Sequence, residues 1–257
     1  MMWLGTLVPL DGSEIINMPR RTGLPDVAFG NPDRPRSVVY QDRTSVDMTP
    51  CKLAIPSVLN VELAERSALE QVVAAVVREN AASSLDAAIF SNVPADSSRP
   101  AGILNGLTPI PGAAGGGLGA LTADIRALAS AITASGGGSK IALFVHPARL
   151  APLFMIAGPS FPHEVIPCRA LSAGDVVSVE AGAFASGVGP IPKIELSDIA
   201  TLHPNAAAAL GPVISPKSRA HPQRGARERR SVGVSLVLDV AWALRAPQVA
   251  MVTRATW

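Results

Sequence analysis

The longest regular pattern of apolar and polar positions lies between residues 60 and 93, a stretch that contains neither glycine nor proline. Ser57 or Asn60 can cap the start of a helix here, and the carboxylates of Glu62 and Glu65 suit the positive end of its dipole. The pattern therefore predicts one long helix that acts as a scaffold element. Small and apolar residues recur at spacings of three and four, which places them on one helix face: Leu69, Val73, Val76, Val77, Ala81, Ser84, Leu85 and Ala88.

Shorter patterns follow in the middle and at the end of the chain. Helical spacing predicts a second helix over residues 121–135, ended by Gly136-Gly137-Gly138, and a short helix over residues 149–157. Strands and helices do not alternate strictly, so a doubly wound nucleotide-binding fold is disfavoured and the class is α+β. Apolar runs predict strands at Ile141–Val145, Val176–Glu180, Ile194–Ile199 and Val249–Val252, and either a strand or a hairpin at Ser231–Leu244.

The first fifty residues show no such regularity, because prolines interrupt them at Pro9, Pro19, Pro25, Pro32, Pro35 and Pro50. Proline fixes φ and removes a hydrogen-bond donor, so no long helix forms here. Residues 37–40 are compatible with one short strand. An extended segment with little core of its own is unusual at the start of a compact domain. We therefore expect an arm or hairpin that packs on a neighbouring molecule.

The composition supports a protein whose surface is covered by other subunits. The 257 residues are enough for one large domain or two smaller ones. Hydrophobic residues make up 48% of the chain and charged residues only 16%. A monomer usually carries more charge, so we expect sister subunits to cover much of the surface. The net charge of +2 is too small to indicate nucleic-acid binding by itself.

The cysteines, the apolar runs and the first residues indicate in which cellular compartment the protein is found. Cys51 and Cys168 lie far apart and match no metal-ligand spacing, so we interpret them as two free thiols. No run of roughly 18 apolar residues is present, which argues against a membrane-spanning helix. The residues from Met1 to Gly5 lack the charged start and apolar core of a signal peptide. We expect a reducing cytoplasm and no contact with a membrane.

The sequence predicts no catalytic, cofactor-binding or metal site. The glycine run at residues 115–119 is followed by no Gly-Lys-Ser/Thr, so a flexible loop is favoured over a phosphate loop. Asp198 and His203 could act as an orienting acid and a base, but no partner nucleophile is indicated. The protein is therefore predicted not to be an enzyme. Each histidine lies beside a proline and no two share metal spacing: His146, His163, His203 and His221.

The densest basic run extends from Lys217 to Arg230. It contains no aromatic residue, so stacking on bases is not suggested. Two interpretations stay open. One is a solvated loop between two strands, and the other is a loop that contacts phosphates or acidic neighbours without sequence preference.

Four segments together resemble the major capsid proteins of tailed phages. The long helix runs into Ser84-Leu85-Asp86-Ala87-Ala88-Ile89-Phe90 and then Arg99-Pro100-Ala101-Gly102-Ile103-Leu104, similar to the end of that family's spine helix. Upstream, Thr49-Pro50-Cys51-Lys52-Leu53-Ala54 resembles the strand that returns from its extended loop. Downstream, Ala142-Leu143-Phe144-Val145-His146-Pro147 resembles a strand of its axial domain, and Asp239 to Ala250 resembles its closing segment.

The resemblance implies a Hong Kong 97-type fold and a role as the shell protein around a double-stranded DNA genome. It implies pentamers and hexamers of the chain itself, contacts with a scaffold, portal and maturation protease, non-specific contact with packaged DNA, and a place in the virion after assembly in the bacterial cytoplasm. The implied parts are an arm and extended loop at 1–45, a peripheral domain at 46–99 and 207–246, and an axial domain at 100–206 and 247–257.

Two departures from the family pattern change what we expect. The part before the extended loop is very short, which suggests a truncated arm or a separate scaffold. Some family members crosslink a loop lysine to an asparagine of a neighbour, but residues 1–51 contain no lysine, so we expect no such crosslink. Two alternatives remain: an encapsulin-like compartment of the same fold, and a cytoplasmic hydrolase of mixed α/β fold.

Overall fold

The computed structural model describes residues 1–2, 4–10, 15–20, 44–60, 69–138, 140–158, 161–189, 193–197 and 231–257. The chain divides into two compact units. One unit contains Met1–Lys52, Ser83–Pro190 and Asp239–Trp257, and the other contains Leu53–Ala82 and Ile191–Leu238. Three elements contribute residues to both units: helix α2 (Leu69–Ile89) and strands β4 (Cys51–Asn60) and β11 (Ser231–Leu244).

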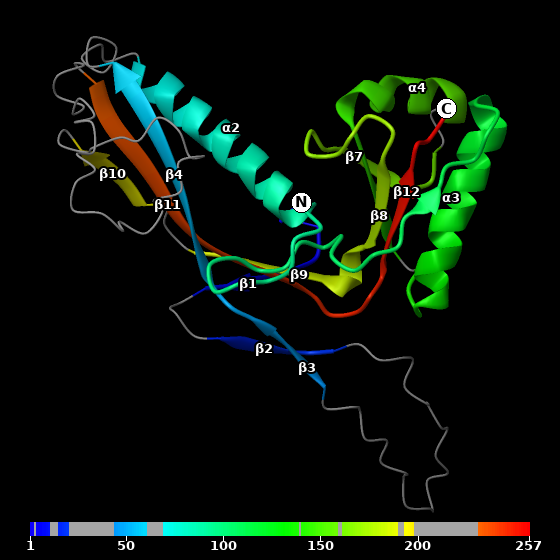
Figure 1. The fold of residues 1–257 in the computed structure, drawn as a ribbon, viewed down its shortest axis with the longest axis horizontal. Helices are drawn as coiled ribbons and strands as arrows, with labels where there is room; N and C mark the ends of the chain where they lie inside the picture. The colour runs from blue at the N-terminus through cyan, green and yellow to red at the C-terminus, as the bar shows by residue number, and fades with distance from the viewer. Residues whose placement is uncertain are drawn as a thin grey trace, which may run out of the picture. The chain divides into compact units, whose positions relative to one another are not determined.

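The unit that holds Leu53–Ala82 is built on the long strand β11. Strand β10 (Lys193–Ser197) pairs with it antiparallel, from Lys193 opposite Val237 to Ser197 opposite Gly233. Strand β4 also pairs with β11, and α2 runs alongside these strands (Figure 1). Of the two forms predicted for residues 231–244, the single strand is confirmed.

In the other unit, a first sheet brings a strand from the start of the chain beside two strands from its last third. Strand β1 (Thr6–Pro9) pairs parallel with β9 (Phe184–Val188), which pairs antiparallel with residues 240–244 of β11. The hydroxyl of Ser186 donates to the carbonyl of Met2 at 2.6 Å. A Cβ on Gly5 would lie 1.9 Å from the carbonyl oxygen of Phe184, so only glycine permits this approach. The expectation that the whole arm packs on a neighbour is thus wrong for Thr6–Pro9, which pair with β9, and for Met2 and Leu10, which are buried in their own unit.

A two-stranded ribbon packs against this first sheet. Strand β2 (Ile16–Pro19) pairs antiparallel with β3 (Ser45–Met48), and their alternate residues face the sheet. The shared core consists of Leu10, Met18, Met48, Ala185 and Ala241. Beyond the ribbon, the amide of Arg20 donates to the carbonyl of Thr44 at 2.8 Å. The strand predicted at residues 37–40 lies outside the described residues.

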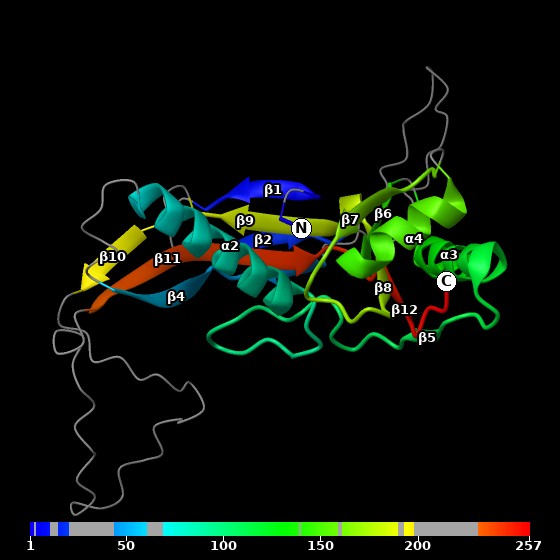
Figure 2. The same ribbon diagram turned by 90° about the horizontal axis from the view of Figure 1, so that it is seen from above.

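A second sheet of the same unit carries its larger core. Its strands lie in the order β5 (Ile110–Pro111), β12 (Val249–Thr253), β8 (Val176–Glu180), β6 (Ile141–Val145) and β7 (Glu164–Pro167). Helices α3 (Gly117–Ala134) and α4 (Pro147–Ala157) cover one face (Figure 2). Apolar residues of both helices and of the sheet form one cluster that includes Leu121, Leu128, Ile132, Leu143, Val145, Leu153, Val176 and Val252.

Two buried carboxylates at this second sheet are hydrogen-bonded within the chain. Asp124 of α3 accepts hydrogen bonds from the amide of Ala113 at 2.8 Å and from the indole of Trp257 at 2.9 Å. The carboxylate of Glu180 accepts from the amides of Gly138 and Lys140. These bonds fix the loops at both ends of α3, because a buried carboxylate without donors would be strongly destabilising.

Two sequence predictions about helices need correction. Helix α3 begins at Gly117, so Gly117 to Gly119 of the glycine run predicted as a flexible loop lie in its first turn, while Gly115 and Gly116 precede the helix. Ser57 and Asn60 lie in strand β4 and do not adjoin the start of α2 at Leu69. Residues 61–68, which were predicted to be helical, lie outside the described residues. On α2, Ala81 is buried as expected, but Val76 is 48% exposed because no described side chain covers it.

The other predicted elements are confirmed with small shifts in their bounds. Helix α4 and strands β6, β8 and β12 occupy the predicted positions, and β10 begins one residue early. Among the described residues, no helix combines the length and hydropathy that crossing a membrane requires.

Candidate functional site

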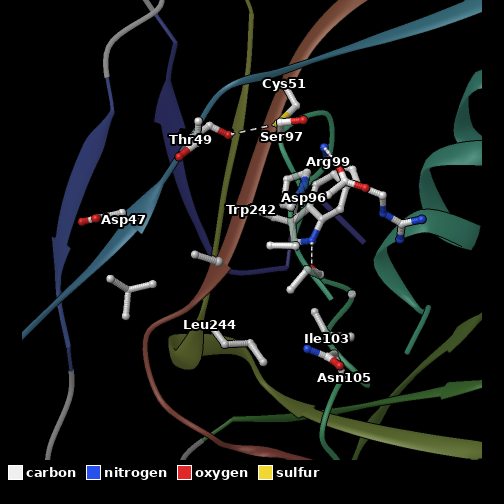
Figure 3. A pocket seen from close by; sticks show the side chains of 16 residues that line it. Asp47, Thr49, Cys51, Asp96, Ser97, Arg99, Ile103, Asn105, Trp242 and Leu244 are labelled. Carbon is white, nitrogen blue, oxygen red and sulfur yellow. Dashed lines mark hydrogen bonds between the residues drawn. The ribbon is translucent and has the colours of Figure 1, made fainter. Parts of the chain in front are cut away.

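A cavity of about 390 Å³ lies in the unit that begins at Met1. Three segments line it: residues between 46 and 51, where β3 ends and β4 begins, residues between 95 and 105 in the loop after α2, and Trp242–Leu244 at the end of β11 (Figure 3). These segments lie far apart in the sequence and meet only in the folded chain.

Trp242 forms a fixed wall of this cavity. Its side chain is only 5% exposed, and its indole N–H donates to the carbonyl of Ala101 at 2.8 Å. The loop beside it is tied back by the amides of Gly102 and Ile103, which donate to the carbonyls of Val93 and Ile89. A Cβ on Gly102 would lie 2.0 Å from the carbonyl oxygen of Ser91, so this loop needs glycine for its close approach.

A tight turn places a carboxylate on the cavity lining. Oδ1 of Asp96 accepts hydrogen bonds from the amide and hydroxyl of Ser98 at 2.6 Å each, and from the amide of Arg99 at 3.0 Å. These bonds, chiefly those from Ser98, hold the pKa of Asp96 below its usual value, so the exposed carboxylate stays ionised. The guanidinium of Arg99 donates instead to the hydroxyl of Ser91 at 2.6 Å.

The thiol on the cavity lining is not activated for chemistry. Burial raises the pKa of Cys51, and the charge of Asp96 raises it further. Burial also raises the pKa of Cys168. Both thiols are free and stay protonated at neutral pH, whereas a nucleophilic cysteine needs a lowered pKa. The cavity therefore offers shape and charge for binding, but its thiol, Cys51, is not an activated nucleophile.

The histidines that fall within the described residues have structural roles. The ring of His146 caps α4, because its Nδ1 accepts the amide hydrogen of Ala148. The ring of His163 lies edge-on to Phe161. No group of three or more metal-ligating side chains occurs in the described part of the chain. Asp198, His203, His221 and the basic run from Lys217 to Arg230 lie outside it.

Helix α4 presents apolar side chains to solvent. Met155 is 85% exposed and Phe154 is 44% exposed. The neighbouring Leu153 of α4 is fully buried in the core cluster that α4 shares with α3. Leu118, in the first turn of α3, is 60% exposed. Large apolar side chains on a surface are typical of regions that contact other proteins.

Sequence reasoning missed most of the residues around the cavity. Asp47, Asp96 and Trp242 were not singled out, and Trp242 appeared only inside the closing segment. One local signal was available, since aspartate two residues before a serine favours the turn that orients Asp96. No local signal marks the cavity itself, because it depends on three distant segments meeting.

Comparison with solved structures gives matches over nearly the whole chain. A structure from Mycobacterium phage Adephagia has a TM-score of 0.67 at 15% identity, covering 97% of this chain and 88% of that one. The capsid of an empty GTA particle has a TM-score of 0.60 at 11% identity, covering 98% and 88%. The satellite phage P4 procapsid has a TM-score of 0.57 at 8% identity, covering 98% and 86%. No protein-family model and no curated protein matches the sequence.

These similarities establish the fold. The chain has the fold of phage capsid proteins, a mixed arrangement of helices and sheets, as the sequence resemblance implied.

Proposed function

We propose that this chain is the major capsid protein of a tailed phage or prophage, and that it assembles into the icosahedral shell around a double-stranded DNA genome. The observation that carries the proposal is the structural similarity to phage and GTA capsids over 97–98% of the chain. A match of that extent includes the described parts of both compact units rather than one common motif.

We assign the chain to the Hong Kong 97 type within this fold, with α2 as the spine helix. The length of α2, 21 residues, supports this assignment. The extended loop would lie within residues 1–45, where the β2–β3 ribbon forms its base. The peripheral domain would comprise residues 46–99 and 207–246, and the axial domain residues 100–206 and 247–257.

Two properties of the chain support self-association. Charged residues make up only 16% of the sequence, so the surface carries few side chains that strongly favour contact with water. Helix α4 exposes Phe154 and Met155. Covering such side chains with a second copy would remove apolar surface from water, which stabilises an assembly.

The partners follow from the proposed role. They are further copies of the chain in pentamers and hexamers, together with a scaffold, a portal and a maturation protease, and DNA bound without sequence preference. The protein would function in the virion, after assembly in the host cytoplasm, as a structural component and not as an enzyme.

Expression of the full chain, with and without a phage scaffold, tests the proposal. We expect closed particles or capsomers by electron microscopy and sedimentation, and DNA inside particles isolated from a producing host. An encapsulin-like compartment would give closed particles that enclose protein without a genome. A monomer that persists at high concentration, even with the scaffold present, would contradict both shell functions.

A further inference from the structure

Helix α4 begins with a turn that relies on one side chain for its cap. The first amides of a helix have no acceptor within the helix itself. Pro147 has no amide hydrogen, and the amide of Arg149 donates to the carbonyl of His146 at 2.8 Å. The amide of Ala148 donates to Nδ1 of the His146 ring at 3.2 Å. An imidazole therefore caps this helix, in the place where serine, threonine, aspartate or asparagine is usual.

The rest of α4 offers little to compensate for a lost cap. The helix has only 11 residues, and Pro152 in its interior removes one further amide donor. Its first turn contains no acidic side chain to suit the positive end of the helix dipole. Short helices depend on caps and on tertiary packing. Here the packing buries Leu153 but leaves Phe154 and Met155 exposed.

Only the neutral ring of His146 can act as this cap. A neutral imidazole has one nitrogen that accepts a hydrogen bond, whereas both nitrogens of an imidazolium carry hydrogens and only donate. A protonated ring would place an N–H against the amide N–H of Ala148, and its charge would lie at the positive end of the helix dipole. Histidine is the side chain whose charge ordinarily changes between about pH 5 and 8. Acidification in this range therefore removes the cap.

Within the described part of the chain, no carboxylate oxygen lies within 4.0 Å of a nitrogen of the His146 ring. The guanidinium of Arg149, on the first turn of α4, donates to the carbonyls of Ala173 at 2.8 Å and Ala255 at 3.0 Å. His163 lies beyond the opposite end of β7, because β7 runs parallel to β6. An imidazolium in this place thus has no ion-pair partner among the described residues.

The other ionisable groups near this end of α4 do not change charge in the same range. Carboxylates ordinarily titrate below about pH 5, and thiols and guanidinium groups above about pH 8. Burial raises the pKa of the Cys168 thiol further. These groups, on the elements around α4, are Cys168 and Arg169 after β7, Asp175 before β8, Asp124 and Arg126 on α3, Arg254 after β12, and Asp86 on α2.

We propose that His146 is a pH-dependent cap, which holds the first turn of α4 at neutral pH and releases it on acidification. The stabilisation is present while the ring is neutral, above roughly pH 7, and is lost as the pH falls towards about 5. Where it concerns assembly, the inference rests on the proposed function. Phe154 and Met155 lie on the same helix, so release of its first turn loosens the apolar surface offered to a second copy.

Hydrogen exchange of the full-length, unassembled chain tests the cap. The measured quantity is the protection of the amides from Ala148 to Ala151, corrected at each pH for the intrinsic exchange rate. We expect this protection to fall about fivefold between about pH 7.5 and about pH 5.5, the effect of losing one helix cap. The amides of β8, which lie in the core of the second sheet, should keep their protection.

Three variants separate the cap from other effects of histidine. H146N introduces an amide whose oxygen can cap the helix at every pH, so protection should stay high and lose its pH dependence. H146A should show low protection at both pH values. H163N is the matched control, because that ring contacts Phe161 and caps no helix, and it should behave as wild type.

The outcomes of the exchange experiment decide the proposal. Wild-type protection that is equal at both pH values would overturn it. So would an H146N variant whose protection falls as the wild type's does, or an H163N variant that no longer responds to pH. Protection of H146A equal to that of wild type at neutral pH would show that the ring does not hold the turn.

Assembly is measured separately, so that the two proposals can fail independently. We expect the concentration that wild type requires for assembly to rise about threefold at the lower pH, and that of H146N to change less. If no particles form at either pH, the proposed function fails, while the exchange experiment still decides the cap. If particles form and both proteins respond equally to pH, the link from the cap to assembly is overturned.

Discussion

The second sheet and the β2–β3 ribbon belong to one compact unit but differ in whether their carboxylates are buried and hydrogen-bonded within the chain. In the second sheet all residues of β8 are buried, and the carboxylates of Asp124 and Glu180 are held by donors of the same chain. In the ribbon only alternate residues face the core. Asp47, on the outward face, is exposed and lines the cavity.

The difference indicates which region is complete within one subunit. A sheet whose buried carboxylates are hydrogen-bonded by its own chain gains that stability when the chain folds. A ribbon with one packed and one exposed face is marginal alone, and contact with another molecule can stabilise it further. Under the proposed function, the second sheet is the rigid part of the subunit and the ribbon side is a place where subunits meet.

The largest expected effect comes from the core of the second sheet. Phe144 is almost fully buried and its ring centroid lies 4.9 Å from that of Phe90. We expect F144A to lower the free energy of unfolding by about 4 kcal/mol, through lost burial and a cavity. Chemical denaturation of unassembled chain measures this. F154A, at the exposed site on α4, should barely change unfolding but should reduce particle yield. Equal destabilisation by the two variants would remove the distinction between core and contact surface.

A second comparison uses two aspartates in different surroundings. D124A leaves the amide of Ala113 and the indole of Trp257 without their acceptor in a buried site. We expect a loss of about 3 kcal/mol in the free energy of unfolding. D96A removes hydrogen bonds from an exposed turn, so its effect on unfolding should be much smaller. A larger loss for D96A than for D124A would show that the cavity loop, and not the second sheet, limits stability.

The ribbon should respond locally. Met48 is fully buried between the ribbon and the first sheet. We expect M48A to destabilise the ribbon by about 2 kcal/mol. Hydrogen exchange of the β2 and β3 amides should quicken, while the amides of β6 and β8 keep their protection. Uniform acceleration in all four strands would mean that the two regions unfold as one and that the comparison fails.

The thiols give a smaller, pH-dependent effect. Because burial and Asp96 raise the pKa of Cys51, its thiolate forms only at higher pH, and alkylation should be slower than for a free thiol at neutral pH and should accelerate as the pH rises. D96N should speed the reaction by no more than about threefold, because water screens the charge of an exposed carboxylate. Cys168 should react only after unfolding. Alkylation of Cys51 that is faster than alkylation of a free thiol at neutral pH would contradict a raised pKa.

The last prediction concerns covalent links between subunits, of which we expect none. Residues 1–51 carry arginines, which stay protonated and cannot attack an amide as a neutral lysine can. Mature particles boiled in reductant should therefore give a single band at the chain mass on a denaturing gel. A ladder of multimers that survives this treatment would show that a lysine elsewhere reaches a neighbour.

Much of the fold could be predicted where local pattern and tertiary packing agree. The short apolar runs at Ile141–Val145 and Val176–Glu180, rich in β-branched residues, are buried strands as their pattern predicted. The pattern also predicted the helix confirmed at Leu69–Ile89. The glycine run was misjudged, because glycines that disfavour a helix by propensity still form its first turn when Asp124 and Thr256 hold the preceding loop.

By itself the sequence determined the elements with strong periodicity, the scarcity of charge and the resemblance to capsid proteins, since these depend on residue types and on spacings of a few positions. The tertiary structure alone decided that β1 pairs with β9, that β11 pairs first with β10 and then with β9, and that Asp47, Asp96 and Trp242 line one cavity. Those arrangements arise from contacts between segments far apart in the chain. The free energy that selects them comes from burying the apolar faces together, which no local window of the chain contains.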